Sequence, residues 1–337
     1  MISLSTHIPD FVFSASLPDK VVISNDHSVD VAITSDLGNV CPPAVYAVYN
    51  GEVTIYDFRR LIETFMEFKE QTVCRFSIKG AEDELKSFFV VYSTEAVSPY
   101  AKEWCNAHFL TTREAGEFVI NNWYTLSFVK TDDHPEKVEF FVNLLKKDGT
   151  IEQAYLAGNT FEEADSLCSF QVPLLAPEDG STVLSVSVRV GARSFTFFRH
   201  EQPFNFSLKF KNAFGVWEVA HLCAVTERKT TDGRKTANIM RRVAVYGAER
   251  KVSFTSTTAP LPIDTARWID QLATSPQVRL FPGGQEIIML NSPVEVSDSR
   301  TDSNSVKFSW QFPDGADHSA EPRYWRIFQK PFNDIFA

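Results

Sequence analysis

The densest group of potential metal ligands in this chain is Asp132-Asp133-His134, because two carboxylates and an imidazole can share one divalent ion. The triplet stands directly before Pro135. Polar clusters of this kind between strands are typical of turns, so the sequence favours a solvated loop over a metal site.

Two acidic runs hold carboxylates of the kind that act as acid and base in glycoside cleavage, Glu82-Asp83-Glu84 and Glu162-Glu163 with Asp165. Nothing in the sequence places a second carboxylate opposite either run, which favours exposed turns. His221 lies within the apolar run 219–225, at a position expected for a strand residue. A structural histidine is therefore favoured there over a general base.

Local motifs of nucleotide-binding and metal enzymes are absent from the sequence, which has no G-x-G-x-x-G after a strand, no Walker loop, no H-E-x-x-H, no G-x-S-x-G and no EF-hand loop. Triads and carboxylate pairs on β scaffolds assemble in space and leave no obligatory local signature. The absence of these motifs therefore argues mainly against a nucleotide-binding enzyme or a zinc hydrolase. We expect a chain with no catalytic residue, no cofactor and no metal.

A basic stretch flanks Asp232-Gly233 and includes Arg228, Lys229, Arg234, Lys235, Arg241 and Arg242. Such a stretch can bind a polyanion or an acidic neighbour. A solvated hairpin is favoured, because charged residues also keep edge strands from aggregating. The first four of these residues form a candidate interface.

The chain ends, from about Ala320, in a segment rich in large apolar side chains that follows the last clear strand. These are Tyr324, Trp325, Ile327, Phe328, Phe332, Ile335 and Phe336. Side chains of this kind need a partner surface. Two alternatives are open, since the tail can fold back onto its own domain or dock on a neighbouring subunit as an arm or added strand.

The elements that must position these residues are mostly strands, because apolar residues recur with the period of two that places them on one face of a sheet. The clearest runs are Cys74, Phe76 and Ile78; Leu184, Val186, Val188 and Val190; Phe204, Phe206, Leu208 and Phe210; and Val306, Phe308, Trp310 and Phe312. Five dipeptides supply the positive φ angles of tight hairpins. They are Asn50-Gly51, Asp148-Gly149, Asp179-Gly180, Asp232-Gly233 and Asp314-Gly315. The sequence therefore predicts antiparallel meanders.

Two segments have helical spacing instead. The first runs from Asp57, a candidate N-cap, to about Lys69, and its apolar face holds Phe58, Leu61, Ile62 and Phe65. The second runs from Ile263 to Ala273 and places Ala266, Ile269 and Leu272 on one face. We expect each short helix to pack on one side of a sheet.

The length of 337 residues exceeds what one hydrophobic core usually serves, and an apolar fraction of 44% is that of an ordinary globular protein. The 29 phenylalanines favour strands. We predict a mainly β fold of three β-sandwich-like modules with two short helices and a C-terminal aromatic tail. Polar or proline-containing junctions place the domains at 1–97, 98–202 and 203–318, with the tail at 319–337.

The net charge of −10 argues against a general nucleic-acid partner. Five widely separated cysteines without a C-x-x-C pair argue against a disulfide framework or zinc ribbon, so we expect buried free thiols. The N-terminus does not look like a secretory signal, and no apolar run reaches the roughly 18 residues that span a bilayer. We expect a protein made in the cytoplasm, without membrane insertion.

The segment Phe210–Glu218 resembles an F-x-N-x-F-x-x-x-E segment of uncharacterised proteins encoded by phages and prophages of Bacteroidetes. The similarity extends to five further segments: Tyr56–Arg59, Phe109–Arg113, Ala266–Val278, Val294–Ser299 and Val306–Trp310. The resemblance implies a phage-type tail or baseplate component and names no active-site residue. Ring-forming tail proteins of this architecture are built from β-sandwich modules around a symmetry axis.

We therefore expect a noncatalytic component of a virion or tail-like particle, made in a bacterial cytoplasm, whose partners are itself in a homo-oligomeric ring and other particle proteins. The alternative is a glycan-binding or adhesion module, for which Trp104, Trp123 and Tyr124 are candidate stacking residues, although core positions are favoured for them. A glycosidase or lyase is a third class and needs paired carboxylates in a cleft.

Overall fold

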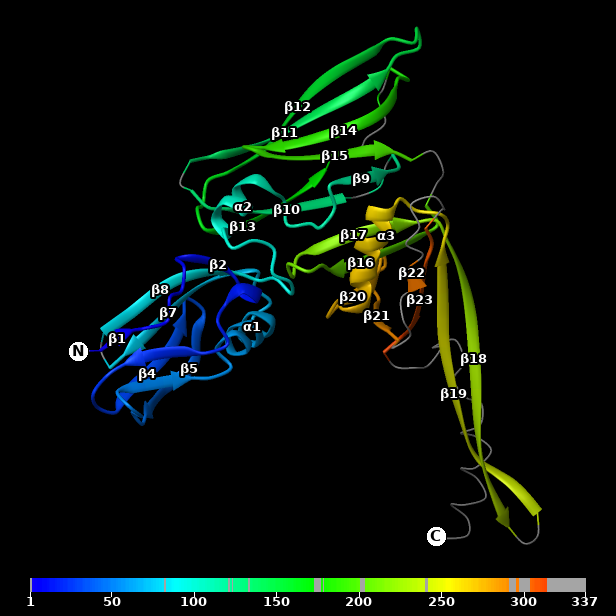
Figure 1. Ribbon diagram of the computed structural model, residues 1–337. Helices are drawn as coiled ribbons and strands as arrows, with labels where there is room; N and C mark the ends of the chain where they lie inside the picture. Colours follow the sequence, from blue (N-terminus) through cyan, green and yellow to red (C-terminus); the bar gives the residue numbers. More distant parts are fainter. Residues whose placement is uncertain are drawn as a thin grey trace, which may run out of the picture. The chain divides into compact units, whose positions relative to one another are not determined.

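The computed structural model describes residues 2–81, 83–120, 122, 124–132, 134–172, 177, 179–200, 204–239, 242–290, 295–296 and 304–313. Strands account for 54% and helices for 12% of the structure, so the predicted mainly β fold is confirmed. The chain divides into two compact units, a first unit of residues 1–221 and a second unit of residues 222–337 (Figure 1). The three-domain boundaries remain a prediction.

The N-terminal part of the first unit contains two sheets. Its strands are β1 (Ser3–Leu4), β2 (Phe11–Phe13), β3 (Val21–Ser24), β4 (Val29–Ser35), β5 (Gly38–Tyr46), β6 (Glu52–Ile55), β7 (Val73–Gly80) and β8 (Asp83–Val91). One sheet has the order β2-β8-β7-β4-β5 and the other β1-β3-β6. All pairings are antiparallel except that of β2 with β8. A single 3-10 turn, η1 (Ser14–Ser16), follows β2.

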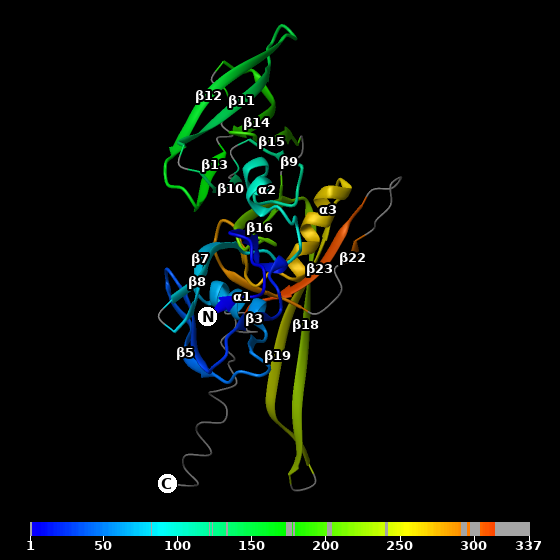
Figure 2. The same ribbon diagram turned by 60° about the vertical axis from the view of Figure 1, so that its left-hand side comes forward.

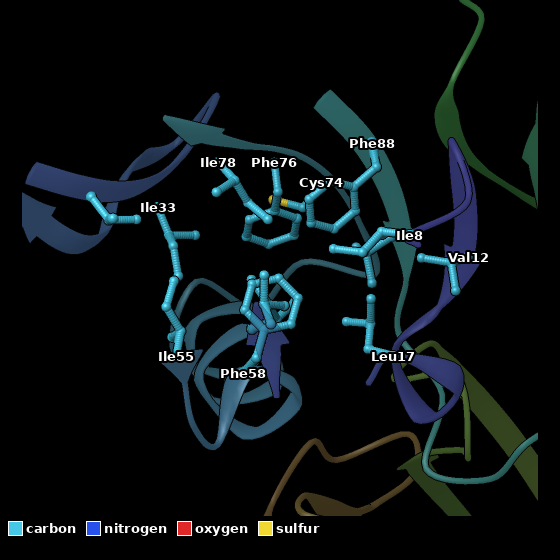
Figure 3. Close-up of a cluster of buried hydrophobic side chains, with 14 of the residues drawn as sticks. Ile8, Val12, Leu17, Ile33, Ile55, Phe58, Cys74, Phe76, Ile78 and Phe88 are labelled. Atoms are coloured by element: carbon cyan, nitrogen blue, oxygen red, sulfur yellow. The ribbon is translucent and has the colours of Figure 1, made fainter. Parts of the chain in front are cut away.

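One helix, α1 (Phe58–Phe68), covers the core between these sheets, as the helical spacing predicted. Asp57 occupies the N-cap position, but its φ is +55° and its side chain makes no capping hydrogen bond. In Figure 3, Phe58 from α1 points toward Phe76 from β7 and Phe88 from β8. All three rings are buried, and each buried Phe contributes about 1.5–3 kcal/mol to stability.

The middle of the first unit contains seven more strands, β9 (Ala115–Phe118), β10 (Tyr124–Lys130), β11 (Glu136–Leu145), β12 (Ile151–Phe161), β13 (Ser166–Val172), β14 (Thr182–Val190) and β15 (Arg193–Arg199). They form a sheet of order β12-β11-β14-β15-β9, with β15 and β9 parallel, and a two-stranded sheet β10-β13. Inward-facing residues of both sheets share one core. Val186, Val188 and Val190 belong to that core, as their alternation predicted, and Leu184 is half-buried.

A third helix, α2 (Ala101–Ala107), corrects the prediction of two. Its seven residues are fewer than the 11 or so over which helical periodicity can be read from a sequence. The first unit ends with β16 (Phe206–Lys211) and β17 (Trp217–Leu222), whose last residue begins the second unit. Leu208 and Phe210 of β16 are buried, as their alternation predicted.

The second unit contains β18 (Ala224–Ile239), β19 (Arg242–Thr258), β20 (Val278–Leu280), β21 (Glu286–Met289), β22 (Glu295–Val296) and β23 (Val306–Gln311). Their order is β20-β21-β23-β19-β18, and β22 pairs with β23. The predicted helix is present as α3 (Ile263–Asp270) with the 3-10 turn η2 (Gln271–Ala273), and Ala266, Ile269 and Leu272 are buried as expected. Within the described residues, no helix is long and apolar enough to cross a membrane.

Strands β18 and β19 form a long two-stranded ribbon that runs away from β20, β21 and β23 (Figures 1 and 2). β19 pairs with β23 only over Phe254–Thr257. From Lys229 to Ile239, β18 pairs with β19 alone among the described strands. At roughly 3.3 Å per residue, the ribbon therefore extends about 35 Å past its last sheet neighbour.

The turn predicted at Asp232-Gly233 is wrong, because both residues lie inside β18, opposite Arg250 and Glu249 of β19. The register continues past them to the pair Ile239 and Arg242. Threonines on both sides of the dipeptide favour an extended strand, and cross-strand pairing has overridden the local turn signal. The glycines of the first three predicted turns have positive φ as expected, at Gly51, Gly149 and Gly180. Asp314-Gly315 lies outside the described residues.

Arg193, the first residue of β15, is fully buried (0% exposed) and joins four elements. Its Nε donates to the Cys105 carbonyl at the end of α2 (2.7 Å), and Nη2 donates to the Val129 carbonyl of β10 (2.8 Å). Nη1 lies 2.9 and 2.8 Å from the two carboxylate oxygens of Glu136 on β11. The guanidinium carbon lies 4.7 Å from the Phe128 ring centroid. The charge is thus paired and hydrogen-bonded, as a buried charge must be.

We predict that Arg193→Met lowers the free energy of unfolding by about 3–5 kcal/mol, because it leaves the Glu136 carboxylate and two carbonyls without their donor. Urea titration followed by circular dichroism measures the loss. Arg199→Met, at the exposed end of the same strand, is the matched control and should change stability by less than about 0.5 kcal/mol. Equal stability of the two variants would contradict the role of Arg193.

Candidate functional site

The F-x-N-x-F-x-x-x-E segment forms the turn between β16 and β17, and Asn212 organises that turn. Its side chain is buried, and Oδ1 accepts hydrogen bonds from the backbone N–H groups of Phe214 (2.9 Å) and Val216 (3.3 Å). The backbone closes the turn, since Gly215 N–H donates to the Asn212 carbonyl (2.9 Å). Gly215 has φ +70°, a conformation that a residue with a Cβ adopts only under strain.

The same turn binds two distant segments of the first unit. Asn212 Nδ2 donates to the Leu110 carbonyl (2.8 Å), which follows α2. The Ala213 carbonyl accepts from Thr94 N–H (2.9 Å), which follows β8. A Cβ at Gly215 would lie only 3.1 Å from the Tyr92 ring. The turn therefore joins both sheet systems of the first unit.

Buried side chains complete the contact, in a set that we call the junction cluster: Phe13, Val91, Ala101, Cys105, Leu110, Val129, Phe214 and Val216. Trp104 of α2 packs against this cluster, with its ring 5.4 Å from Phe13 and 5.3 Å from Phe214. The residues that carry the sequence resemblance therefore have a packing role.

Glu218, the last residue of the segment, is buried near a second buried arginine, Arg113. Burial lowers the pKa of Arg113, and the negative charge of Glu218 opposes that shift. The guanidinium carbon of Arg113 also lies 5.7 Å from the Phe195 ring centroid. Because a guanidinium stays protonated in proteins, this pair supplies no acid and base for catalysis at neutral pH.

His221 has the structural environment that its strand position predicted. Its Nδ1 lies 2.7 Å from the Ser207 hydroxyl. The imidazole stacks on Phe204 and meets the edge of Tyr124, with ring centroids 5.9 and 4.9 Å apart. A hydroxyl partner and two aromatic rings fix the orientation of the imidazole, so the half-buried His221 has structural contacts.

The sequence-predicted metal and acid–base candidates lie on the surface. Asp132 and His134 are exposed, and Asp132 Oδ1 accepts the backbone N–H of His134 in a turn (3.2 Å); Asp133 lies outside the described residues. Among the residues that the structure describes, no three His, Cys, Asp or Glu side chains are grouped as metal ligands. Glu162 and Glu163 are exposed between β12 and β13.

The other acidic run differs from its prediction, because Asp83 and Glu84 begin β8 instead of forming a turn. Both are exposed, and Glu84 accepts a hydrogen bond from the Ser77 hydroxyl (3.1 Å). Pairing of β8 with β7 extends the strand to its polar end. Glu82 lies outside the described residues.

Two of the buried cysteine thiols, Cys74 and Cys105, are not poised for nucleophilic chemistry. Cys74, Cys105 and Cys168 are buried as expected, whereas Cys41 and Cys223 are half-buried, which corrects the expectation for these two. Burial raises the pKa of Cys105 to about 12, although the nearby Arg193 charge lowers it. Burial also raises the pKa of Cys74 to about 12, and Asp36 adds to the shift. Protonated thiols are weak nucleophiles.

The candidate interface lies on the ribbon. Arg228 and Lys229 are exposed on β18. The backbones of Arg234 and Lys235 belong to the same strand, and their side chains lie outside the described residues. The aromatic tail from Tyr324 to Phe336 also lies outside them.

Two of the three residues predicted for glycan stacking, Tyr124 and Trp104, make packing contacts instead. Tyr124 is buried in the core, and Trp104 is half-buried with His108 stacked on its ring at 4.7 Å. Trp123 lies outside the described residues. The favoured core position is thus found for Tyr124, whereas Trp104 packs at the border of the junction cluster.

A different surface combines exposed rings with amides, namely the solvent face of the sheet β12-β11-β14-β15-β9, which we call the outer face. Tyr155 and Phe198 are 50% and 54% exposed there, and Phe141 lies beside Tyr155 with centroids 5.7 Å apart. Asn143 Nδ2 donates to the Ser185 hydroxyl (2.8 Å). Rings flanked by amides and hydroxyls are able to stack on a sugar and hydrogen-bond to it.

No model of a known protein family matches the chain, and no curated protein matches its sequence. The resemblance to phage-encoded proteins therefore rests on the sequence segments alone.

We predict that Asn212→Ala lowers the free energy of unfolding by about 2–3 kcal/mol, because buried N–H and C=O groups lose their partner. Asn212→Asp keeps the acceptor for Phe214 N–H but loses the donor to Leu110, so it should also destabilise. Urea titration compares both with Asn39→Ala, an exposed asparagine on β5, for which little change is expected. Full stability of Asn212→Ala would show that the turn does not depend on its amide.

Proposed function

We propose that this chain is a noncatalytic structural component of a phage virion or tail-like particle, a tail, baseplate or connector protein that forms a homo-oligomeric ring and docks to neighbouring proteins. The observation that carries the proposal is the ribbon of β18 and β19, which runs about 35 Å past its last sheet neighbour.

A ribbon of this length is a costly element for an isolated chain. Ordering each residue costs about 1–2 kcal/mol of backbone entropy, and a two-stranded hairpin alone is marginally stable in water. Its strands also expose backbone groups that invite pairing with another chain. A neighbouring molecule that covers the ribbon offsets these costs, which supports an assembly role.

Several side chains of types that can take part in catalysis make structural contacts instead, which supports the noncatalytic part of the proposal. Arg193 and Glu136 hold strands together, Asn212 organises a turn, and His221 is packed between rings. The contacts of each of these side chains are structural. We also propose, as the finer architecture, β-sandwich-like modules around the shared cores and an aromatic tail that docks on a neighbouring protein.

The expected result is that purified full-length protein forms closed rings in negative-stain images, or joins particles when co-expressed with its neighbouring gene products. Image classes and sedimentation velocity measure the assembly. Persistent monomers that enter no particle would contradict the proposal.

A glycan-binding or adhesion module is the second candidate. The surface that supports it is the outer face with its exposed rings, because Tyr124 is buried. Tyr155→Ala with Phe198→Ala should abolish any glycan-array signal of the wild type. Tyr56→Ala, at another exposed tyrosine, is the matched control and should leave the signal intact. A wild type that binds no glycan at high micromolar concentration would exclude this role.

A further inference from the structure

The charges of the chain are segregated between its parts. The first unit, residues 1–221, holds 18 basic and 30 acidic residues. The ribbon, residues 224–258, holds 8 basic and 3 acidic residues. A strongly acidic unit and a basic ribbon therefore belong to one chain, and opposite potentials of this kind guide association.

The ribbon is suited to an electrostatic contact more than to an apolar one. In the sequence of this segment the basic residues come as adjacent pairs: Arg228-Lys229, Arg234-Lys235, Arg241-Arg242 and Arg250-Lys251. Of the 16 residues between these pairs, eight are threonine, alanine or valine. Arg228 and Lys229 are both exposed and, as neighbours in a strand, belong to opposite faces of the ribbon.

The acidic charge of the first unit is densest at its beginning. Residues 1–57 contain seven acidic residues and a single basic one. All seven are exposed: Asp10, Asp19, Asp26, Asp30, Asp36, Glu52 and Asp57. Lys86 and Arg59 pair with Asp10 and Asp19, so five carboxylates of this region have no salt bridge within the described residues.

Exposed apolar side chains stand directly opposite two of these carboxylates. Val45 of β5 is 73% exposed and faces Asp30 of β4 in register. Tyr49 is 80% exposed and faces Glu52 across the next turn. We call Asp30, Val45, Tyr49 and Glu52 the acidic edge. Apolar groups beside carboxylates match the long apolar stems and charged ends of Arg and Lys.

We propose that the basic ribbon of one copy of this chain docks on the acidic edge of a second copy. This inference rests on the proposed function and names the contact that would build the ring. The contact is heterologous, because each copy offers a ribbon and an edge at different sites, and a heterologous contact forms a ring when the rotation between copies closes. A nucleic-acid partner is disfavoured, because the first unit repels phosphate.

The test uses charge reversal on each side of the contact in the full-length chain. Arg228→Glu with Lys229→Glu reverses the ribbon, and Asp30→Lys with Glu52→Lys reverses the edge. Each double variant should weaken self-association at least about tenfold in sedimentation velocity. An equimolar mixture of the two double variants should recover self-association. The acidic ribbon of the first variant pairs with the basic edge of the second, and the native ribbon of the second pairs with the native edge of the first.

Lys102→Glu with Lys147→Glu is the matched control, since it changes the net charge of the chain as much as the ribbon variant does, at exposed positions of the first unit. It should associate like the wild type. Raising the salt concentration from about 0.05 to 0.5 M should weaken the wild-type assembly, because exposed charge pairs are screened.

Two outcomes would overturn the proposal. If the ribbon variant still assembles like the wild type, the ring uses another contact and the proposed particle role stands. If the wild type stays monomeric but binds a labelled DNA duplex that the ribbon variant does not bind, the ribbon serves a polyanion. Wild-type protein that neither assembles nor enters particles contradicts the proposed function itself.

Discussion

The guanidinium of Arg193 imposes the strictest local requirement on the first unit, because a charge taken fully out of water must be matched on every side. Its donors reach α2, β10 and β11 at once, and Phe128 covers its face. These partners lie 57 to 88 residues away along the chain. None can shift alone without leaving a buried polar group unsatisfied, so the helix and three strands form one rigid body.

Asn212 joins distant segments at the junction by hydrogen bonds, as Arg193 joins the sheets, but its side chain is neutral. Its amide is an acceptor for its own turn and a donor to Leu110, 102 residues earlier. The rings of Phe13, Trp104 and Phe214 then fill the space around it. Arg193 and Asn212 thus hold distant segments together, whereas most of the ribbon pairs only with itself among the described strands.

Strands and helices with a clear period could be predicted from the sequence, because burial on one face selects apolar residues at fixed spacing. Phe76 in β7 and Ile269 in α3 lie where their spacing placed them. The Asp232-Gly233 turn failed because strand pairing overrode a local signal, and α2 was too short to show a period. Arg193 could not be found, because its partners are adjacent only after folding.

The two parallel pairings have a consequence for biosynthesis. Strand β2 can pair with β8 only after Phe89 has been synthesised. Strand β9 can pair with β15 only after Thr196 has been synthesised. The junction cluster can form only after Phe214 has been synthesised and can pack against Phe13. At a translation rate of about 5–20 residues per second, Phe13 emerges roughly 10–40 s before Phe214, and β2 and β9 each emerge roughly 4–16 s before their parallel partners. Over that interval the nascent chain exposes unpaired β edges, so its yield should depend on chaperones that bind it on the ribosome.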